Sequence, residues 1–211
     1  MPAMDSKAAI LNRVRAAAAG MERIAPSPAP PPPRTRSLTN LGLIELFAKM
    51  AVAAGASVER VADAARVPHA VTDRLGALGM PPEVRAAGDP WLRTVPWGRR
   101  PSLAISFGRA RAGDQVGVSA ALAGVAETGT LVIPSGSDQA TGLLFLPPLQ
   151  IVILPLHHIV GTFDDAWHGI AIRQQARGLG MPSAVSMVTG VEATGAMLHV
   201  ILVGEPDAAH A

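Results

Sequence analysis

Residues 116–137 constrain the fold of this chain more than any other segment, and they read VGVSAALAGVAETGTLVIPSGS. Two pieces rich in β-branched residues, at 116–118 and 130–133, lie on either side of a run of alanine and glycine. Apolar runs of this length, bounded by turn-forming residues, are typical of strands buried inside a sheet. We therefore predict buried strands here, with the polar residues 127–130 exposed between them.

The tetrapeptide Glu127-Thr128-Gly129-Thr130 is the strongest candidate for a functional site. Glu127 can serve as an acid, a base or a nucleophile. Gly129 would let a ligand approach the backbone N–H groups, because glycine has no Cβ. The alternative is a tight turn in which the glutamate and the threonines satisfy local backbone groups. The tetrapeptide alone does not separate these two interpretations.

Strand and helix patterns alternate along most of the chain. Strands separated by helices favour a mainly parallel sheet covered on both faces. Aromatic residues make up only 3% of the sequence, so the core must consist of alanine, valine, leucine and isoleucine. We predict a three-layer α/β/α protein. The expected strands are 57–61, 84–86, 103–107, 116–118, 126–133, 151–154, 185–188 and 198–203, and the expected helices are 41–54, 68–78, 120–124, 141–146 and 163–177.

The first 40 residues differ from the rest. Ile10, Leu11 and Val14 give residues 1–20 the narrow apolar stripe of a helix. Residues 21–40 are rich in proline, including SPAPPPP at 27–33, which favours an extended linker. We therefore predict an N-terminal helix at 1–20, a linker at 21–40, an α/β domain at 41–205 and a tail at 206–211.

Composition excludes several classes of function. The 211 residues include no cysteine, which excludes disulfides, thiolate nucleophiles and cysteine-ligated iron–sulfur clusters on this chain. The formal charge is only +2 and the basic residues are scattered, which argues against nucleic-acid binding. We recognise no secretory signal and no apolar stretch long enough to span a membrane. We therefore expect a soluble cytoplasmic protein.

Three polar, glycine-containing segments follow expected strands. In an open α/β sheet, ligands bind beyond the carboxyl ends of the strands, so we expect these segments to meet there. Together they would hold a phosphate, a carboxylate or a thioester-like group on N–H and O–H donors, with Glu127 as the reactive side chain. The expected ligand-binding residues are Thr128, Gly129, Thr130, Ser135, Gly136, Ser137, Thr189 and Gly190.

His157 and His158 are a weaker candidate site. They follow the expected strand at 151–154 and could flank a cleft. Adjacent residues of an extended chain point to opposite sides, however, which makes the pair poor joint metal ligands. We expect no metal site. We also find neither the glycine fingerprint of a dinucleotide-binding fold nor a phosphate-binding loop motif.

Several blocks of sequence, taken together, resemble the LUD domain of the lactate-utilisation protein C family. They are AETGTLV at 126–132, LPPLQIVILP at 146–155, LHVILV at 198–203, ILNRVRA at 10–16 and FAKMAVAAGA at 47–56. The resemblance covers most of the chain. It implies an α/β/α fold similar to sugar-phosphate isomerases, CoA transferases and formyltetrahydrofolate cyclo-ligases, whose ligands lie at the carboxyl ends of strands.

The resemblance also implies work beside two partner proteins, one bearing iron–sulfur clusters, in oxidising L-lactate to pyruvate. It assigns no activity to this subunit itself. We therefore expect a non-redox subunit that contributes a small-molecule pocket or an assembly surface, with no cofactor of its own. The alternatives are a free-standing enzyme or binding protein for a phosphorylated or CoA-linked small acid, using Glu127, and a purely structural partner.

One segment departs from the family pattern. After the penultimate strand the family usually has a Gly-Pro-Ser-Arg-Thr-Ala-Asp-Ile-Glu-like segment, whereas residues 189–195 of this chain read TGVEATG. The arginine and the helix-opening hydroxyl groups are missing. If that arginine holds an anionic group in the family, this chain binds its ligand differently or not at all.

Overall fold

The computed structural model describes residues 34–135, 141–176, 178, 180, 182, 184–190 and 196–206. The predicted N-terminal helix, residues 21–33 of the predicted linker and residues 207–211 of the predicted tail lie outside these residues. The rest of the linker contains the short 3-10 helix η1 (Arg34–Ser37), and helix α2 begins at Asn40.

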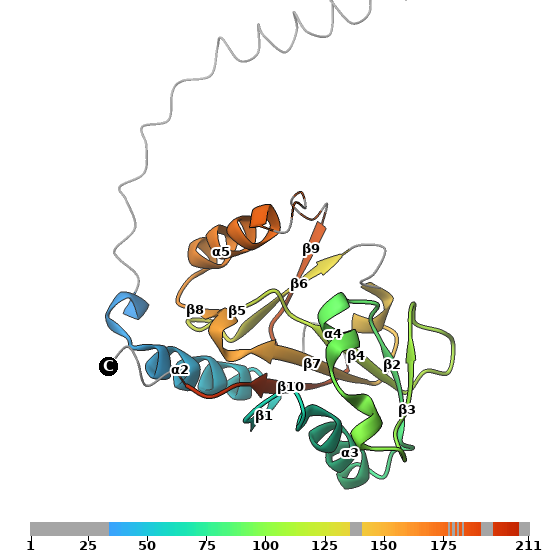
Figure 1. Cartoon of the computed structure of the whole chain (residues 1–211). Coiled ribbons are helices and arrows are strands. Elements are labelled where there is room, and N and C mark those ends of the chain that lie inside the picture. The colour runs from blue at the N-terminus through green and yellow to red at the C-terminus, as the bar shows by residue number, and fades with distance from the viewer. Residues whose placement is uncertain are drawn as a thin grey trace, which may run out of the picture. The chain divides into compact units, whose positions relative to one another are not determined.

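A six-stranded sheet forms the centre of the described part of the chain (Figure 1). All its neighbouring strands are parallel, which confirms the predicted mainly parallel α/β fold. The order across the sheet is β1 (Ser57–Val61), β10 (Met197–Val203), β7 (Leu149–Pro155), β4 (Val116–Ala120), β2 (Glu83–Ala86) and β3 (Ala104–Phe107).

Strand β7 explains why the sheet is covered on both faces. All seven of its residues are buried. Because side chains alternate along a strand, Ile151 and Ile153 join one core cluster and Val152 and Leu154 join the other. A strand whose side chains are buried on both faces is stable only between two layers.

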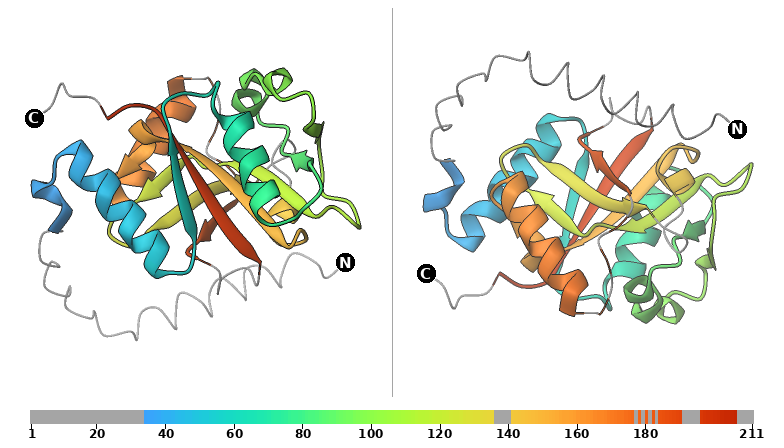
Figure 2. Two further views of the ribbon diagram at one scale, coloured as in Figure 1. Left: turned by 90° about the horizontal axis from the view of Figure 1, so that it is seen from below. Right: turned by 90° about the horizontal axis from the view of Figure 1, so that it is seen from above.

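Helices α2 (Asn40–Ala53) and α3 (Val67–Ala77) supply part of these two layers. They lie on opposite sides of β1 and β10 (Figure 2, left). The Thr39 side chain begins α2 by accepting a hydrogen bond from the Gly42 N–H. Proline in the first turn of α3 costs no backbone hydrogen bond. The remaining short helices are α4 (Pro90–Thr94), η2 (Trp97–Arg99), η3 (Thr141–Leu144) and η4 (Leu156–His158).

A second, four-stranded sheet was not expected as a separate unit. Its order is β8 (Ile159–Val160), β5 (Ala123–Val125), β6 (Thr130–Ser135) and β9 (Ala184–Val188). Strand β6 is antiparallel to both its neighbours. One face packs towards α2 and the six-stranded sheet, and the other packs against α5 (Phe163–Ala176) (Figure 2, right).

The helical turn predicted at residues 120–124 is wrong, because Ala123 and Gly124 belong to β5. An added Cβ at Gly124 would lie 2.6 Å from Leu154 Cδ2 and 2.9 Å from Phe47 Cε2. The small residues therefore serve close packing of an extended segment, and this tertiary requirement outweighs the helix propensity of alanine. None of the helices in the described ranges is long and apolar enough to cross a lipid bilayer.

Candidate functional site

Three threonines from two of the predicted site segments meet beside the β5–β6 turn. Thr130 Oγ1 lies 2.8 Å from Thr128 Oγ1 and 2.6 Å from Thr189 Oγ1. Strand pairing produces this contact, because Leu131 lies opposite Val188 in the antiparallel ladder. Thr130 is 2% exposed. The hydroxyl groups thus satisfy one another in a place where unpaired polar groups would be costly.

The glycines of these segments have a packing role. Gly129 and Gly190 both have a positive φ, +69° and +68°, which side chains rarely tolerate. A Cβ on Gly129 would overlap the backbone of Ala51, and one on Gly190 would overlap that of Ala54. Both turns therefore pack directly onto the C-terminal end of α2, which fills the space that a ligand would need.

The remaining predicted residues lie apart from the threonines or outside the described ranges. Glu127 is exposed, and its backbone N–H donates to the Gly161 carbonyl at 3.3 Å. Ser135 pairs with Ala184 at the other end of β6, about 17 Å from Thr130 at the usual rise of a strand. Gly136 and Ser137 are not described. The structure thus brings two of the three polar segments together, and a ligand role for them stays a prediction.

A pocket of about 120 Å³ lies instead at the carboxyl edge of the six-stranded sheet. Strand β4 ends there at Ala120 and β7 ends there at Pro155. The segment after β2 contributes Asp89 and Trp91. The other lining residues are Ala121, Leu122, His157 and His158. This is the edge at which parallel α/β sheets usually bind ligands.

His157 and His158 are side chains of this pocket that could donate hydrogen bonds to a bound ligand. They lie on the 3-10 turn η4 rather than on extended chain, so the prediction that they point apart is wrong. Their ring centroids are 4.4 Å apart in an edge-to-face arrangement, with His157 exposed and His158 half-buried. An imidazole N–H can donate a hydrogen bond to a carboxylate.

Asp89 holds Trp91 in place in the lining of the same pocket. Its Oδ1 accepts hydrogen bonds from the N–H groups of Trp91 at 2.8 Å and Leu92 at 3.2 Å. These bonds cap α4 and partly neutralise the carboxylate. Trp91 therefore has a fixed place at the pocket.

A second hollow of about 120 Å³ lies on the other side of His157. Its polar lining comes from Asn40 at the start of α2 and from Glu205 after β10. His157 therefore borders two pockets. Among the residues that the structure describes, no three histidine, aspartate or glutamate side chains are grouped to hold a metal ion.

The sequence contained a signal for this site. His157 and His158 closely follow β7, and ligands of parallel α/β sheets usually bind beyond the carboxyl ends of such strands. The 3-10 turn that brings the rings together was not recognisable from two adjacent histidines.

Comparison with known proteins identifies a matching family and a solved structure with a similar fold. A family model described as the LUD domain matches residues 38–210. A crystal structure of a DUF162 family protein from Deinococcus radiodurans is similar, with a TM-score of 0.60 and 21% sequence identity. The match covers 79% of this chain and 99% of that protein. No curated protein matches the sequence.

Proposed function

The chain belongs to the LUD-domain family, and on that premise we propose that it is a non-redox subunit of a cytoplasmic system that oxidises L-lactate to pyruvate. The observation that carries this proposal is the family match over residues 38–210. The sequence contains no cysteine, which agrees with electron transfer through iron–sulfur clusters on partner proteins.

The carboxyl-edge pocket is the place where this subunit would contribute to such a system. Its volume is well below the roughly 300–1,000 Å³ of pockets for drug-sized ligands, so it suits a small acid. In the proposed role His157 and His158 bind the carboxylate of a small hydroxy or keto acid, and Trp91 covers its apolar side. The iron–sulfur partners carry the electrons.

Growth on L-lactate tests this proposal. We expect deletion of the gene in the source organism to abolish growth on L-lactate, and the intact gene to restore it. His157→Ala should restore growth poorly, because the pocket loses its exposed imidazole. His168→Ala is the matched control, since His168 is an exposed histidine on α5 away from the pocket residues, and it should restore growth fully.

Co-purification tests the partners. Tagged protein from lactate-grown cells should carry iron and acid-labile sulfide bound to cysteine-rich partner chains. A deletion strain that grows normally on L-lactate, or a tagged chain that purifies alone from those cells, would contradict the proposed role.

A second candidate function uses Glu127. The observation that favours it is the exposure of the Glu127 carboxylate, which is accessible to act as a base or a nucleophile in an enzyme or binding protein for a phosphorylated or CoA-linked small acid. Glu127→Gln separates the candidates. Lost growth on lactate with the complex still assembled supports a chemical role of Glu127, and unchanged growth argues against it.

A further inference from the structure

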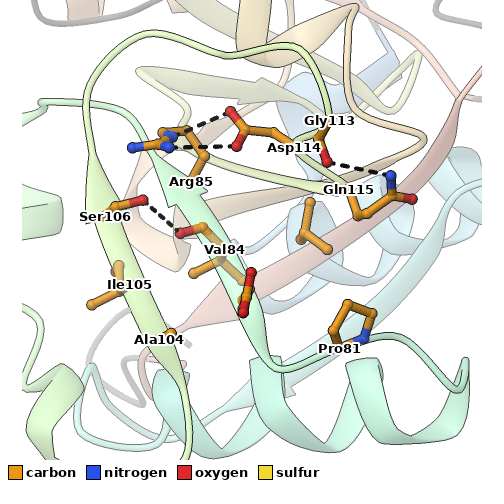
Figure 3. A pocket seen from close by; sticks show the side chains of 11 residues that line it. Pro81, Val84, Arg85, Ala104, Ile105, Ser106, Gly113, Asp114 and Gln115 are labelled. Atoms are coloured by element: carbon orange, nitrogen blue, oxygen red, sulfur yellow. Dashed lines mark hydrogen bonds and ion pairs between the residues drawn. The ribbon is translucent and has the colours of Figure 1, made fainter.

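The amino edge of the six-stranded sheet contains a larger pocket of about 170 Å³ (Figure 3). Its lining includes the first residues of three strands, Glu83 of β2, Ala104 of β3 and Val116 of β4. Because all strands of this sheet are parallel, this pocket lies at the opposite edge from His157. Neither the family match nor the proposed function assigns it a role.

The pocket exists because two neighbouring strands separate. Strands β2 and β4 pair only through Arg85 with Gly117 and Ala86 with Val118. Towards the amino edge the ladder is open, so Glu83 and Val84 of β2 are not paired with Gln115 and Val116. Strand β2 remains fully paired with β3 on its other side, so the opening has a rigid wall.

Arg85 is the central charged group of this pocket. Its Nε lies 3.2 Å from Asp114 Oδ2 and its Nη2 lies 3.5 Å from Oδ1. The Arg85 side chain is only 10% exposed, so this ion pair fixes its position. Nη1 makes no hydrogen bond to any residue in the described ranges, and Figure 3 shows one guanidinium nitrogen turned away from Asp114.

Asp114 is fully occupied by its own partners. Burial raises the pKa of its carboxyl group, but the Arg111 N–H at 2.6 Å and the Arg85 guanidinium outweigh burial and hold the pKa below its ordinary value. The carboxylate therefore stays ionised and orients Arg85.

Glu83 provides the opposite charge. It precedes Arg85 by two residues on β2, so the two side chains leave the same face with their Cα atoms about 7 Å apart. Ser106 lies beside Arg85 in the β2–β3 register. The pocket thus has a guanidinium edge at one end, an exposed carboxylate at the other, and apolar walls from Pro81, Ala104 and Val116.

We propose that this pocket binds a free amino acid, a small molecule with both a carboxylate and a protonated amine. The ligand carboxylate receives hydrogen bonds from Arg85 Nη1, and the ammonium group lies at Glu83. The lining contains two carboxylates, of Glu83 and Asp114, and one guanidinium, so a simple anion such as lactate is disfavoured. This inference does not depend on the proposed function.

Binding of amino acids to the full chain tests it. Each of the common amino acids is titrated into the protein by calorimetry at millimolar concentration, beside its N-acetyl derivative and beside lactate. We expect saturable binding of at least one amino acid, and at least about tenfold weaker binding of the N-acetyl derivative, which keeps the carboxylate but loses the positive charge.

Glu83→Gln is the informative variant, because Glu83 is exposed and its replacement leaves the buried ion pair intact. It should weaken binding about five- to tenfold without lowering the thermal midpoint. Glu45→Gln, at an exposed position on α2, is the control and should bind normally. Absence of binding across the panel, equal binding of the N-acetyl derivative, or unchanged binding by Glu83→Gln would each overturn the proposal.

Discussion

Polar side chains at the two edges of the six-stranded sheet differ in their exposure to solvent. At the amino edge, Arg85 and Asp114 form an ion pair whose side chains are only 10% and 17% exposed. At the carboxyl edge, His157 is exposed and borders two pockets. The same parallel sheet therefore has a nearly buried ion pair at its amino edge, which contributes to stability and orients Arg85, and an exposed histidine at its carboxyl edge.

Histidine illustrates the contrast well. His199 of β10 is 3% exposed, and its Nδ1 lies 2.8 Å from the Oγ of Ser57, the first residue of β1. Burial, followed by the Arg74 charge, lowers its pKa to about 4. Residue type alone therefore does not determine a role, because burial decides which protonation states are accessible.

His199 should produce the strongest effect, a dependence of the unfolding free energy on pH. An unfolded histidine accepts a proton near pH 6.5, whereas folded His199 resists protonation down to about pH 4. The unfolding free energy should therefore fall as pH decreases through this window, by about 3 kcal/mol in total. Urea denaturation at a series of pH values measures it.

His199→Gln isolates this contribution, because an amide does not titrate. The groups that face His199 remain in the variant: Glu59, whose pKa burial and then Asp73 raise, and Arg74. The raised pKa of Glu59 acts in the opposite sense, since folding then favours its protonated form. Equal pH dependence in both proteins would show that His199 is not the responsible group.

Asp114→Asn should produce the next largest effect. It leaves Arg85 nearly buried without its counter-charge, which should cost about 2 kcal/mol of unfolding free energy at pH 7. Asp73→Asn is the control, because the ion pair of Asp73 with Arg100 has side chains that are 69% and 35% exposed. It should cost less than about 0.5 kcal/mol. If both variants lost a similar unfolding free energy, the nearly buried Arg85–Asp114 pair would contribute no more to stability than the exposed Asp73–Arg100 pair.

His157→Ala should change stability least, by less than about 0.5 kcal/mol, because the side chain is exposed. The same variant is expected to impair growth on lactate. A stability loss as large as that of Asp114→Asn would mean that the exposed histidine and the nearly buried ion pair contribute equally to stability. Thermal melting of the two variants beside the intact protein measures this directly.

Most elements of the fold could be predicted from local patterns. The strand at 57–61 has its predicted ends, and α2 and α5 begin within one residue of their predicted starts. These segments have clear periodicity and turn-forming residues at their ends. The two-residue strand β8 and the separate second sheet could not be predicted, because their existence depends on pairing between distant segments.

The candidate site was predictable only in part. Thr128, Thr130 and Thr189 do meet, but in the antiparallel ladder of the second sheet and not at the carboxyl edge of the parallel sheet, where they were predicted. The position of Ser135 at the far end of β6 could not be predicted from the sequence. It results from antiparallel pairing, which reverses the direction of the partner strand.

Residue types and their local order are enough to specify the parallel α/β sheet, the absence of cysteine chemistry and the family. Three further features depend on contacts between remote segments: the packing of Gly129 and Gly190 against α2, the two pockets beside His157, and the separation of β2 from β4 near Arg85. Cavities and close contacts arise where segments remote in sequence meet. Local conformational preferences do not determine which remote segments meet or how closely they approach.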